Sequence, residues 1–494
     1  MRERPLLGGG TRATHRPDVP YALFIAGEWA PARNAFPAVD PSVGAAWAEI
    51  PEADAAQVEG AVAAARKAAA GWRRAGPAAR QEALWRMADR IEADRDRWAA
   101  LLATEGGRPV RESYLCDIPA CVATLRLYSG LARGHRGEQV PMEDPHAMAY
   151  TLREPLGVLA VRVPWTLPLV SLAGQVGPAL AAGNTVVVRP DGAASATVLE
   201  FARAAGDLLP PGAVNVLTGV APETDALLDG HGEVHRVVTP AGPGHRSGVM
   251  VVLPDADLDA AVADAATALC TAGGEAGATP ARLLVHESVH DEFAGRLAAL
   301  LDAVVLGDPL DLATELGPLI SAARRDEART AVRRAAAEGA RVLAGGGTPA
   351  LPPPLDGGYF FRPTLLAREE GAGAGASPLP GPVAVLEPFR EERGLAERLN
   401  AEAPPAAHRR RAVGVWTGDL ARAHALARDL EAGIVWINRW FDSPVGFQAN
   451  EAPASGAGDE LGERTLARYS TAKVVSADLG SRRPPLWGGG TAGS

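Results

Sequence analysis

Short apolar runs alternate with helix-like stretches between residues 148 and 253, and this alternation is the clearest pattern in the chain. The predicted strands are residues 158–163, 185–188, 213–217 and 234–238. Helical periodicity between them is seen at residues 167–182 and 195–208. This βαβ order is typical of a parallel, doubly wound sheet, and such sheets bind ligands beyond the carboxyl ends of their strands. We therefore expect a ligand-binding domain in this part of the chain.

The regions before and after it also combine helices and strands. Residues 21–29 alternate like a first strand, and two alanine-rich helices are predicted at residues 53–72 and 77–104. Further helix and strand patterns lie at residues 257–273, 282–286, 288–303, 322–345, 412–437 and 470–478. Residues 346–382 are rich in glycine, proline and leucine and predict an irregular surface loop.

The composition excludes several classes of protein. The chain has 494 residues, of which 47% are apolar and 22% charged, as in an ordinary globular protein of about three domains. Its formal net charge of −10 provides no basic field for nucleic acid or an anionic membrane. No apolar run of about 20 residues predicts a transmembrane helix, and the start lacks an apolar signal-peptide core. We expect a cytoplasmic protein with neither a nucleic acid nor a membrane as partner.

Cysteine usage gives no sign of a metal or disulfide site. The three cysteines are Cys116, Cys121 and Cys270. They are too few and too scattered for a disulfide framework or a zinc cluster. We interpret them as structural thiols and expect no metal.

An ordered set of short motifs resembles the aldehyde dehydrogenase superfamily from about residue 21 to residue 477. The motifs are Phe24–Trp29, Glu154–Val158, Pro164–Leu169, Gly183–Val188, Pro211–Val216, Asp255–Asp259, Gly381–Val383 and Trp436–Asn438. Each motif is short, whereas their order and spacing together are specific. The resemblance implies an α/β fold with a Rossmann-like nucleotide-binding domain, a related α/β catalytic domain and a small β-ribbon for oligomer contacts.

The resemblance also implies a division of the chain into these parts. The nucleotide-binding domain is expected at residues 21–135 and 154–243, the catalytic domain at 244–445, and the oligomerisation ribbon at 136–153 and 446–479. Residues 1–20 and 480–494, which are rich in glycine and proline, are expected to be disordered tails.

The nucleophile of the family is missing from this chain. The family uses a cysteine thiolate because attack on an aldehyde carbon needs a strong nucleophile. Counting forward from Asp255 without a gap, this cysteine falls on Gly277, and the flanking residues match on both sides. Cys270 lies two helical turns upstream, too far to act in its place. The resemblance therefore implies a degenerate catalytic site.

The other catalytic positions are changed as well. The family's general base, a glutamate, falls on Pro243, in a loop shortened so that a helix facing the cofactor pyrophosphate is missing. His245 in this loop is interpreted as an ordinary exposed histidine. The asparagine that donates to the oxyanion falls on Thr166, and loss of one such donor typically lowers a rate by ~10²–10³-fold.

The cofactor positions retain only part of the family pattern. NAD or NADP is the cofactor that the resemblance implies, with Trp165 and Arg189 as its remaining contacts. Arg189 replaces the lysine that holds the adenosine ribose, and Gly192 replaces the glutamate beside it. Pro378 replaces the glutamate that holds the nicotinamide ribose. These changes argue against cofactor binding.

Three functions remain open from the sequence. The first is a catalytically inactive scaffold or regulatory subunit, as a homo-oligomer or as a hetero-oligomer with an active aldehyde dehydrogenase paralogue. The predicted final strand, residues 470–478, offers an edge for such pairing. The second is an active NAD(P)-dependent aldehyde dehydrogenase with a non-standard site. The third is a sensor that binds a nucleotide or metabolite.

Overall fold

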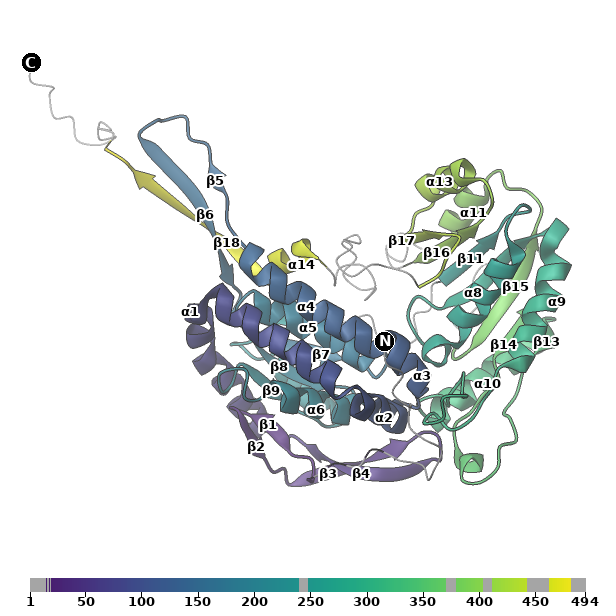
Figure 1. Ribbon diagram of the computed structural model, residues 1–494, viewed down its shortest axis with the longest axis horizontal. Coiled ribbons are helices and arrows are strands. Elements are labelled where there is room, and N and C mark those ends of the chain that lie inside the picture. The colour runs from purple at the N-terminus through teal and green to yellow at the C-terminus, as the bar shows by residue number, and fades with distance from the viewer. Residues whose placement is uncertain are drawn as a thin grey trace, which may run out of the picture.

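The computed structural model describes residues 15, 17, 19–239, 248–369, 379–402, 411–441 and 462–480. These residues form two lobes, each built on its own mixed sheet, and a thin ribbon that projects from the first lobe (Figure 1). Helices pack against both sheets (Figure 1). The expected α/β fold class is confirmed.

The first lobe contains a six-stranded sheet in the order β10-β7-β8-β9-β1-β2. Its strands are β1 (Leu23–Ile25), β2 (Glu28–Ala30), β7 (Val158–Val163), β8 (Thr185–Pro190), β9 (Val214–Val216) and β10 (Arg236–Val238). The last four are parallel and confirm the strands predicted for the central region. Alternate residues of β7 enter two separate apolar clusters, because side chains of a strand point to opposite faces and both faces are covered.

The helical stretches predicted at residues 53–72, 77–104, 167–182 and 195–208 are present in this lobe, whereas a further helix at residues 222–229 was not predicted. The helices are α1 (Ala55–Ala93), α2 (Arg95–Gly106), α3 (Val110–Glu112), α4 (Ile118–Gly134), α5 (Pro168–Ala181), α6 (Ser195–Ala205) and α7 (Pro222–Asp229). The axis of α1 breaks at Gly76, which has φ of 81° and precedes Pro77, where the sequence predicted a gap. The prediction of one continuous helix at residues 77–104 is wrong, because Asp94 has non-helical geometry and separates α1 from α2.

The second lobe contains a seven-stranded sheet in the order β13-β14-β15-β12-β11-β16-β17. Its strands are β11 (Gly248–Val252), β12 (Pro280–His286), β13 (Arg341–Ala344), β14 (Thr364–Ala367), β15 (Val383–Phe389), β16 (Ala412–Trp416) and β17 (Ile434–Ile437). Its helices are α8 (Leu258–Cys270), α9 (Glu287–Ala303), α10 (Ala322–Ala337), α11 (Leu395–Ala401) and α13 (Leu420–Asp429). The stretch 346–382 is not wholly irregular as expected, since β14 inside it pairs with β13 and β15.

The ribbon consists of β5 (Gln139–Val140), β6 (Ala147–Pro155) and β18 (Ser470–Asp478), and the short α14 (Glu463–Arg468) leads into it. β18 runs antiparallel to β6 along its whole length, from Ser470 opposite Pro155 to Asp478 opposite Ala147. The three strands extend away from both lobes (Figure 1). In the described part of the chain, the outer edge of β18 has no neighbouring strand.

Two features of the N-terminal region differ from the sequence-based expectation. The hairpin of β3 (Asn34–Asp40) and β4 (Ala45–Glu52) is not among the strands predicted from the sequence. His15 lies in the stretch expected to be a disordered tail, yet it is only 6% exposed. Its ring packs edge-on against Trp47, and its backbone N–H donates to Thr104 Oγ1 at 3.1 Å. These contacts hold it against the first lobe.

Candidate functional site

The loop that carries Gly277 joins the end of α8 to the start of β12. After Cys270 the backbone makes a tight turn in which Ala272 and Gly273 have φ of 54° and 63°. Gly277 then lies exposed in a turn directly before β12. With no side chain beyond its α-carbon, this position provides neither a nucleophile nor a general base.

Buried ion pairs hold this loop against its surroundings. Glu275 is 2% exposed and pairs with Arg324 Nε at 2.8 Å. From the first lobe, Glu112 Oε1 accepts the backbone N–H of Ala272 at 2.7 Å. Arg108 pairs in turn with this carboxylate at 2.9 Å. The loop is therefore fixed by charged groups from both lobes.

The space beside this loop is almost filled. Trp165, Thr166, Glu112, Gly273 and Glu275 are among the residues that line a hollow of about 20 Å³. A volume of this size holds about one water molecule, whereas pockets for organic ligands measure about 300–1,000 Å³. Thr166 lines this hollow together with Ala272, Gly273 and Glu275 of the Gly277 loop, and a space of this size is too small for an aldehyde.

No described cysteine replaces the missing nucleophile. Burial, together with the charges of Glu112 and Glu315, raises the pKa of the Cys270 thiol to about 12. Only about one such thiol in 10⁵ is ionised at pH 7. Burial also raises the pKa of Cys116 and of Cys121. All three thiols are therefore protonated and poorly reactive.

A larger groove of about 800 Å³ lies at the carboxyl ends of β7 and β8. Its lining includes Arg162, Arg189, Gly192, Asp225 and Thr239. This is the edge at which the βαβ pattern predicted a ligand site. Trp165 lines the small hollow and not this groove, so the structure separates the two predicted cofactor contacts.

Arg189 lines the groove, and most of its N–H donors are hydrogen-bonded to backbone carbonyls of the protein. Its side chain is 4% exposed. Nη1 donates to the carbonyls of Pro190 at 2.9 Å and Gly219 at 2.6 Å, and Nη2 donates to that of Ala221 at 3.4 Å. Burial lowers the pKa of this guanidinium to about 10, which leaves it charged at neutral pH. Arg189 thus fastens the loop between β9 and α7.

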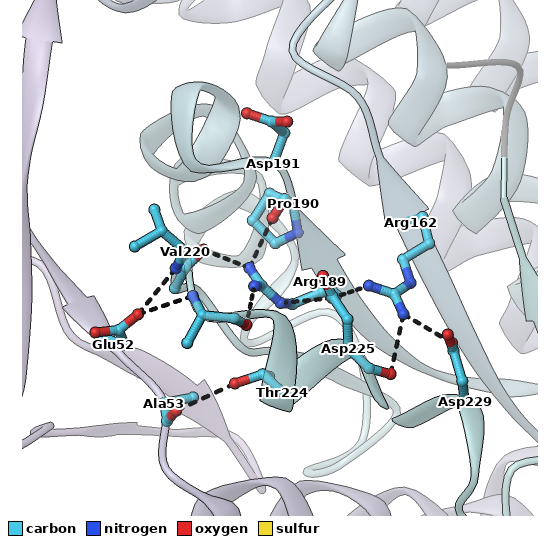
Figure 2. Close-up of polar contacts among 12 residues, drawn as sticks. Glu52, Ala53, Arg162, Arg189, Pro190, Asp191, Val220, Thr224, Asp225 and Asp229 are labelled. Atoms are coloured by element: carbon cyan, nitrogen blue, oxygen red, sulfur yellow. Dashed lines mark hydrogen bonds and ion pairs between the residues drawn. The ribbon is translucent and has the colours of Figure 1, made fainter. Parts of the chain in front are cut away.

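Arg162 and two carboxylates of α7 form an ion-pair cluster in the same groove (Figure 2). Arg162 Nη1 pairs with Asp225, and its Nη2 donates to the Asp225 carbonyl at 3.1 Å and to Asp229 Oδ1 at 2.7 Å. Asp225 Oδ1 also lies 3.1 Å from Arg189 Nε. One carboxylate is therefore shared between two arginines.

This cluster was not predicted, although the sequence contains two signals for it. Arg162 is the one charged residue in the otherwise apolar run of β7, and a charge in a buried strand needs a partner. Asp225 and Asp229 are four residues apart, which places them on one face of a helix. What the sequence could not show is that α7 lies beside the end of β7.

The charge of the groove is predominantly negative. Its ionisable lining residues are the two arginines and four carboxylates, Glu105, Asp191, Asp225 and Asp229. Glu105 is buried and accepts the N–H groups of Ala196 at 2.6 Å and Thr197 at 2.9 Å, at the start of α6. A ligand with two phosphates would therefore meet more carboxylates than guanidinium groups.

Glu105 is expected to make stability depend on pH. Burial raises the pKa of its carboxyl group from 4.5 to about 7, so the folded protein retains a proton that the unfolded chain loses earlier. This contribution is present in full below pH 4.5 and is lost as the pH rises to about 7, with a loss of about 3 kcal/mol in the free energy of unfolding. Urea unfolding between pH 4.5 and 8 measures it. In Glu105→Gln this slope should flatten, and an identical slope in both proteins would contradict the assignment.

Several predicted positions lie outside the described residues, namely Pro243, His245 and Pro378. In the described ranges, no group of three or more histidine, cysteine, aspartate or glutamate side chains is arranged to hold a metal ion. No described helix is both long and apolar enough to cross a membrane.

Comparison with known proteins gives matches over nearly the whole chain. The sequence profile of the aldehyde dehydrogenase family matches residues 29–242 and 247–475. The (Z)-2-((N-methylformamido)methylene)-5-hydroxybutyrolactone dehydrogenase of Acinetobacter baylyi is 33% identical over 482 residues, which cover 92% of this chain and 96% of that protein. The mitochondrial aldehyde dehydrogenase of Homo sapiens is 33% identical over 489 residues, which cover 92% of this chain and 92% of that protein. Among solved structures, PnpE from Pseudomonas sp. WBC-3 in complex with nicotinamide adenine dinucleotide is 31% identical with a TM-score of 0.87, covering 94% of this chain and 99% of that chain.

Proposed function

Because the chain belongs to the aldehyde dehydrogenase family, we propose that it keeps the fold of that family without its oxidation chemistry and acts through protein contacts. Its role is that of a scaffold or regulatory subunit. It assembles either with itself or with an active aldehyde dehydrogenase paralogue.

The observation that carries this proposal is the loop of Gly277. Covalent attack on an aldehyde needs a side-chain nucleophile, and this exposed turn has none. The adjoining hollow of about 20 Å³ is too small for an aldehyde. Restoring a single group would therefore not restore a place for the substrate.

The groove supports the same conclusion for the cofactor. A relative, PnpE, has been solved in complex with NAD. Here Arg189 uses both terminal nitrogens on backbone carbonyls, and Asp225 lies between it and Arg162. The residues of this groove do not fit the ribose and phosphates of a dinucleotide, so we infer that NAD and NADP are not bound.

The ribbon supports a role in assembly. Edge strands with free backbone groups pair readily with another chain. On this ribbon Val474 of β18 is 67% exposed and Leu152 of β6 is 43% exposed. These exposed apolar side chains next to an open strand edge favour contact with a second subunit.

Sedimentation velocity of the full-length chain tests this role. The wild-type protein is expected to sediment as a multiple of its 51.1 kDa mass. Val474→Asp places a charge in the contact and is expected to raise the dissociation constant at least tenfold, which corresponds to about 1.4 kcal/mol. Leu115→Asp is the matched control, because Leu115 is 72% exposed on another part of the first lobe. A wild-type monomer that also forms NADH from aldehydes would refute the proposal.

The sensor hypothesis is the second candidate, and the groove of about 800 Å³ favours it because ligand pockets have this size. Calorimetric titration of the wild-type chain with NAD and NADP decides between the two. Absence of heat at millimolar nucleotide ends the hypothesis of a nucleotide sensor. The third hypothesis, an active enzyme with a non-standard site, receives no support from the three protonated cysteines.

A further inference from the structure

Cations gather at the base of the ribbon, where β6 and β18 leave the first lobe. We call this surface the ribbon root and define it by residues 73–82 of α1, 133–138 at the end of α4, 153–155 of β6 and 468–473 at the start of β18. These segments contain eight arginine and lysine residues and three carboxylates, whereas the whole chain has 49 and 59. The cations are Arg73, Arg74, Arg80, Arg133, Arg136, Arg153, Arg468 and Lys473. A positive surface therefore lies on an otherwise acidic protein.

Direct contacts join the four segments into one surface. Arg73 Nη2 of α1 and Lys473 Nζ of β18 both pair with Glu154 Oε1 of β6, at 2.7 and 3.0 Å. At the end of α4, the side chain of Arg133 donates to the side chain of Gln81 in α1. Figure 1 shows α4 and α14 beside the base of β6 and β18. The cations of the ribbon root are therefore neighbours in space, although they are distant in sequence.

Half of these cations have no carboxylate partner among the residues that the structure describes, namely Arg74, Arg80, Arg136 and Arg153. Arg80 is the most buried of the four. A Cβ added at Gly183 would lie 2.5 Å from its Nη1, and its Nε is buried without an acceptor in the described part of the chain. Elsewhere on the surface, Arg126 and Arg296 each bridge two carboxylates. The ribbon root thus keeps positive charge that its described surroundings do not neutralise.

We propose that the ribbon root binds an acidic segment of a partner protein. Guanidinium groups donate two parallel hydrogen bonds to a carboxylate, and complementary charge gives such contacts their specificity. Apolar side chains lie beside the charges, since Leu152 is the register partner of Lys473 and is 43% exposed, and Val474 is 67% exposed. This mixture suits a peptide chain better than the continuous phosphates of a nucleic acid, which the net charge of −10 also repels. The inference names the chemistry of a partner, and it rests on the proposed role in protein contacts.

The chain offers a matched pair of triple substitutions for the test. The first variant loses three exposed, unpaired charges of the ribbon root: Arg74→Gln, Arg136→Gln and Arg153→Gln. The control variant loses three charges that are likewise exposed and unpaired among the described residues, but lie outside the ribbon root: Arg33→Gln, Arg341→Gln and Arg393→Gln. Neither set breaks an ion pair between described residues, so both variants are expected to fold. Circular dichroism and urea unfolding verify this, and the three single substitutions replace a triple variant that does not fold.

Fluorescence anisotropy with a labelled peptide of about 12 residues, in which glutamate alternates with alanine, gives the readout. At low salt, the full-length wild type is expected to bind this peptide at least about tenfold more tightly than its glutamine analogue. The ribbon-root variant should bind it at least about fivefold more weakly than the wild type, and the control variant within about twofold of it.

Three results would overturn the proposal. They are a wild type that does not prefer the glutamate peptide, an equal loss of affinity in both variants, and tighter binding of single-stranded RNA or of phosphatidylserine vesicles than of the peptide. Sedimentation of Val474→Asp tests the role in assembly separately, so each conclusion can fail without the other.

Discussion

Replacing Gly277 with cysteine is expected to leave the purified protein at least about 10⁴-fold less active in aldehyde oxidation than an active relative. The substitution restores the nucleophile, but the position of the base remains Pro243 and that of the oxyanion donor Thr166. A missing general base typically lowers a rate by ~10²–10⁴-fold and a missing donor by ~10²–10³-fold. The neighbouring hollow of about 20 Å³ also remains too small for the substrate.

NADH formation at 340 nm, with NAD or NADP and a panel of aldehydes, is the measurement. The mitochondrial aldehyde dehydrogenase of Homo sapiens, a 33% identical relative, serves as the active reference. Labelling with iodoacetamide verifies that the new thiol is accessible, since Gly277 is exposed. Gly60→Cys is the labelling control, because Gly60 is exposed on α1 and a Cβ added there meets no atom within 4 Å outside its own stretch of helix. A rate within about 100-fold of the reference would show that the base and cofactor positions have been misassigned.

The parts of the fold that depend on local patterns could be predicted from the sequence. β7 and β8 are mostly apolar because both their faces are buried. Such a continuous apolar run can be recognised in a few residues of sequence. The break of α1 at Gly76 could be predicted because Gly76 is followed by Pro77, a pair that interrupts helices. The assignment of Gly277 to the nucleophile position rests on the motifs on both sides of it in the sequence, and it stays a prediction.

Features that depend on distant contacts could not be predicted. The carboxylate of Asp225 meets Arg162 only because α7 packs beside β7, 63 residues earlier in the chain. His15 is buried because its ring packs on Trp47 and its backbone N–H donates to Thr104, and both residues are distant in sequence. The small hollow lined by Thr166 and Gly273 likewise depends on how the two lobes meet. No short window of sequence contains these distances, which is why the ion pairs of Arg162 with Asp225 and Asp229 were identified only in the structure.

Arg108→Ala is expected to lower the free energy of unfolding by about 3–5 kcal/mol, because it removes the cation from a buried cluster. Arg108 is 7% exposed on its side chain and binds Asp117 through Nε at 2.7 Å and Nη2 at 2.8 Å. It also pairs with Glu112 at 2.9 Å. Without it, two carboxylates remain buried together without a counter-ion, and one of them is the group that accepts the N–H of Ala272. The loop of Gly277 should therefore loosen before the rest of the fold.

Urea unfolding and amide hydrogen exchange measure the two parts of this expectation. Arg296→Ala is the matched control, because Arg296 also bridges two carboxylates, Asp259 and Glu292, but its side chain is 44% exposed. Solvent screens such pairs, so its loss should change the free energy of unfolding by no more than about 1 kcal/mol. Faster exchange at Ala272 in Arg108→Ala alone would link the cluster to the loop. Equal destabilisation by both substitutions would mean that burial of the Arg108 cluster adds nothing to the free energy of unfolding beyond an exposed ion pair. The lobes would then be joined by other contacts.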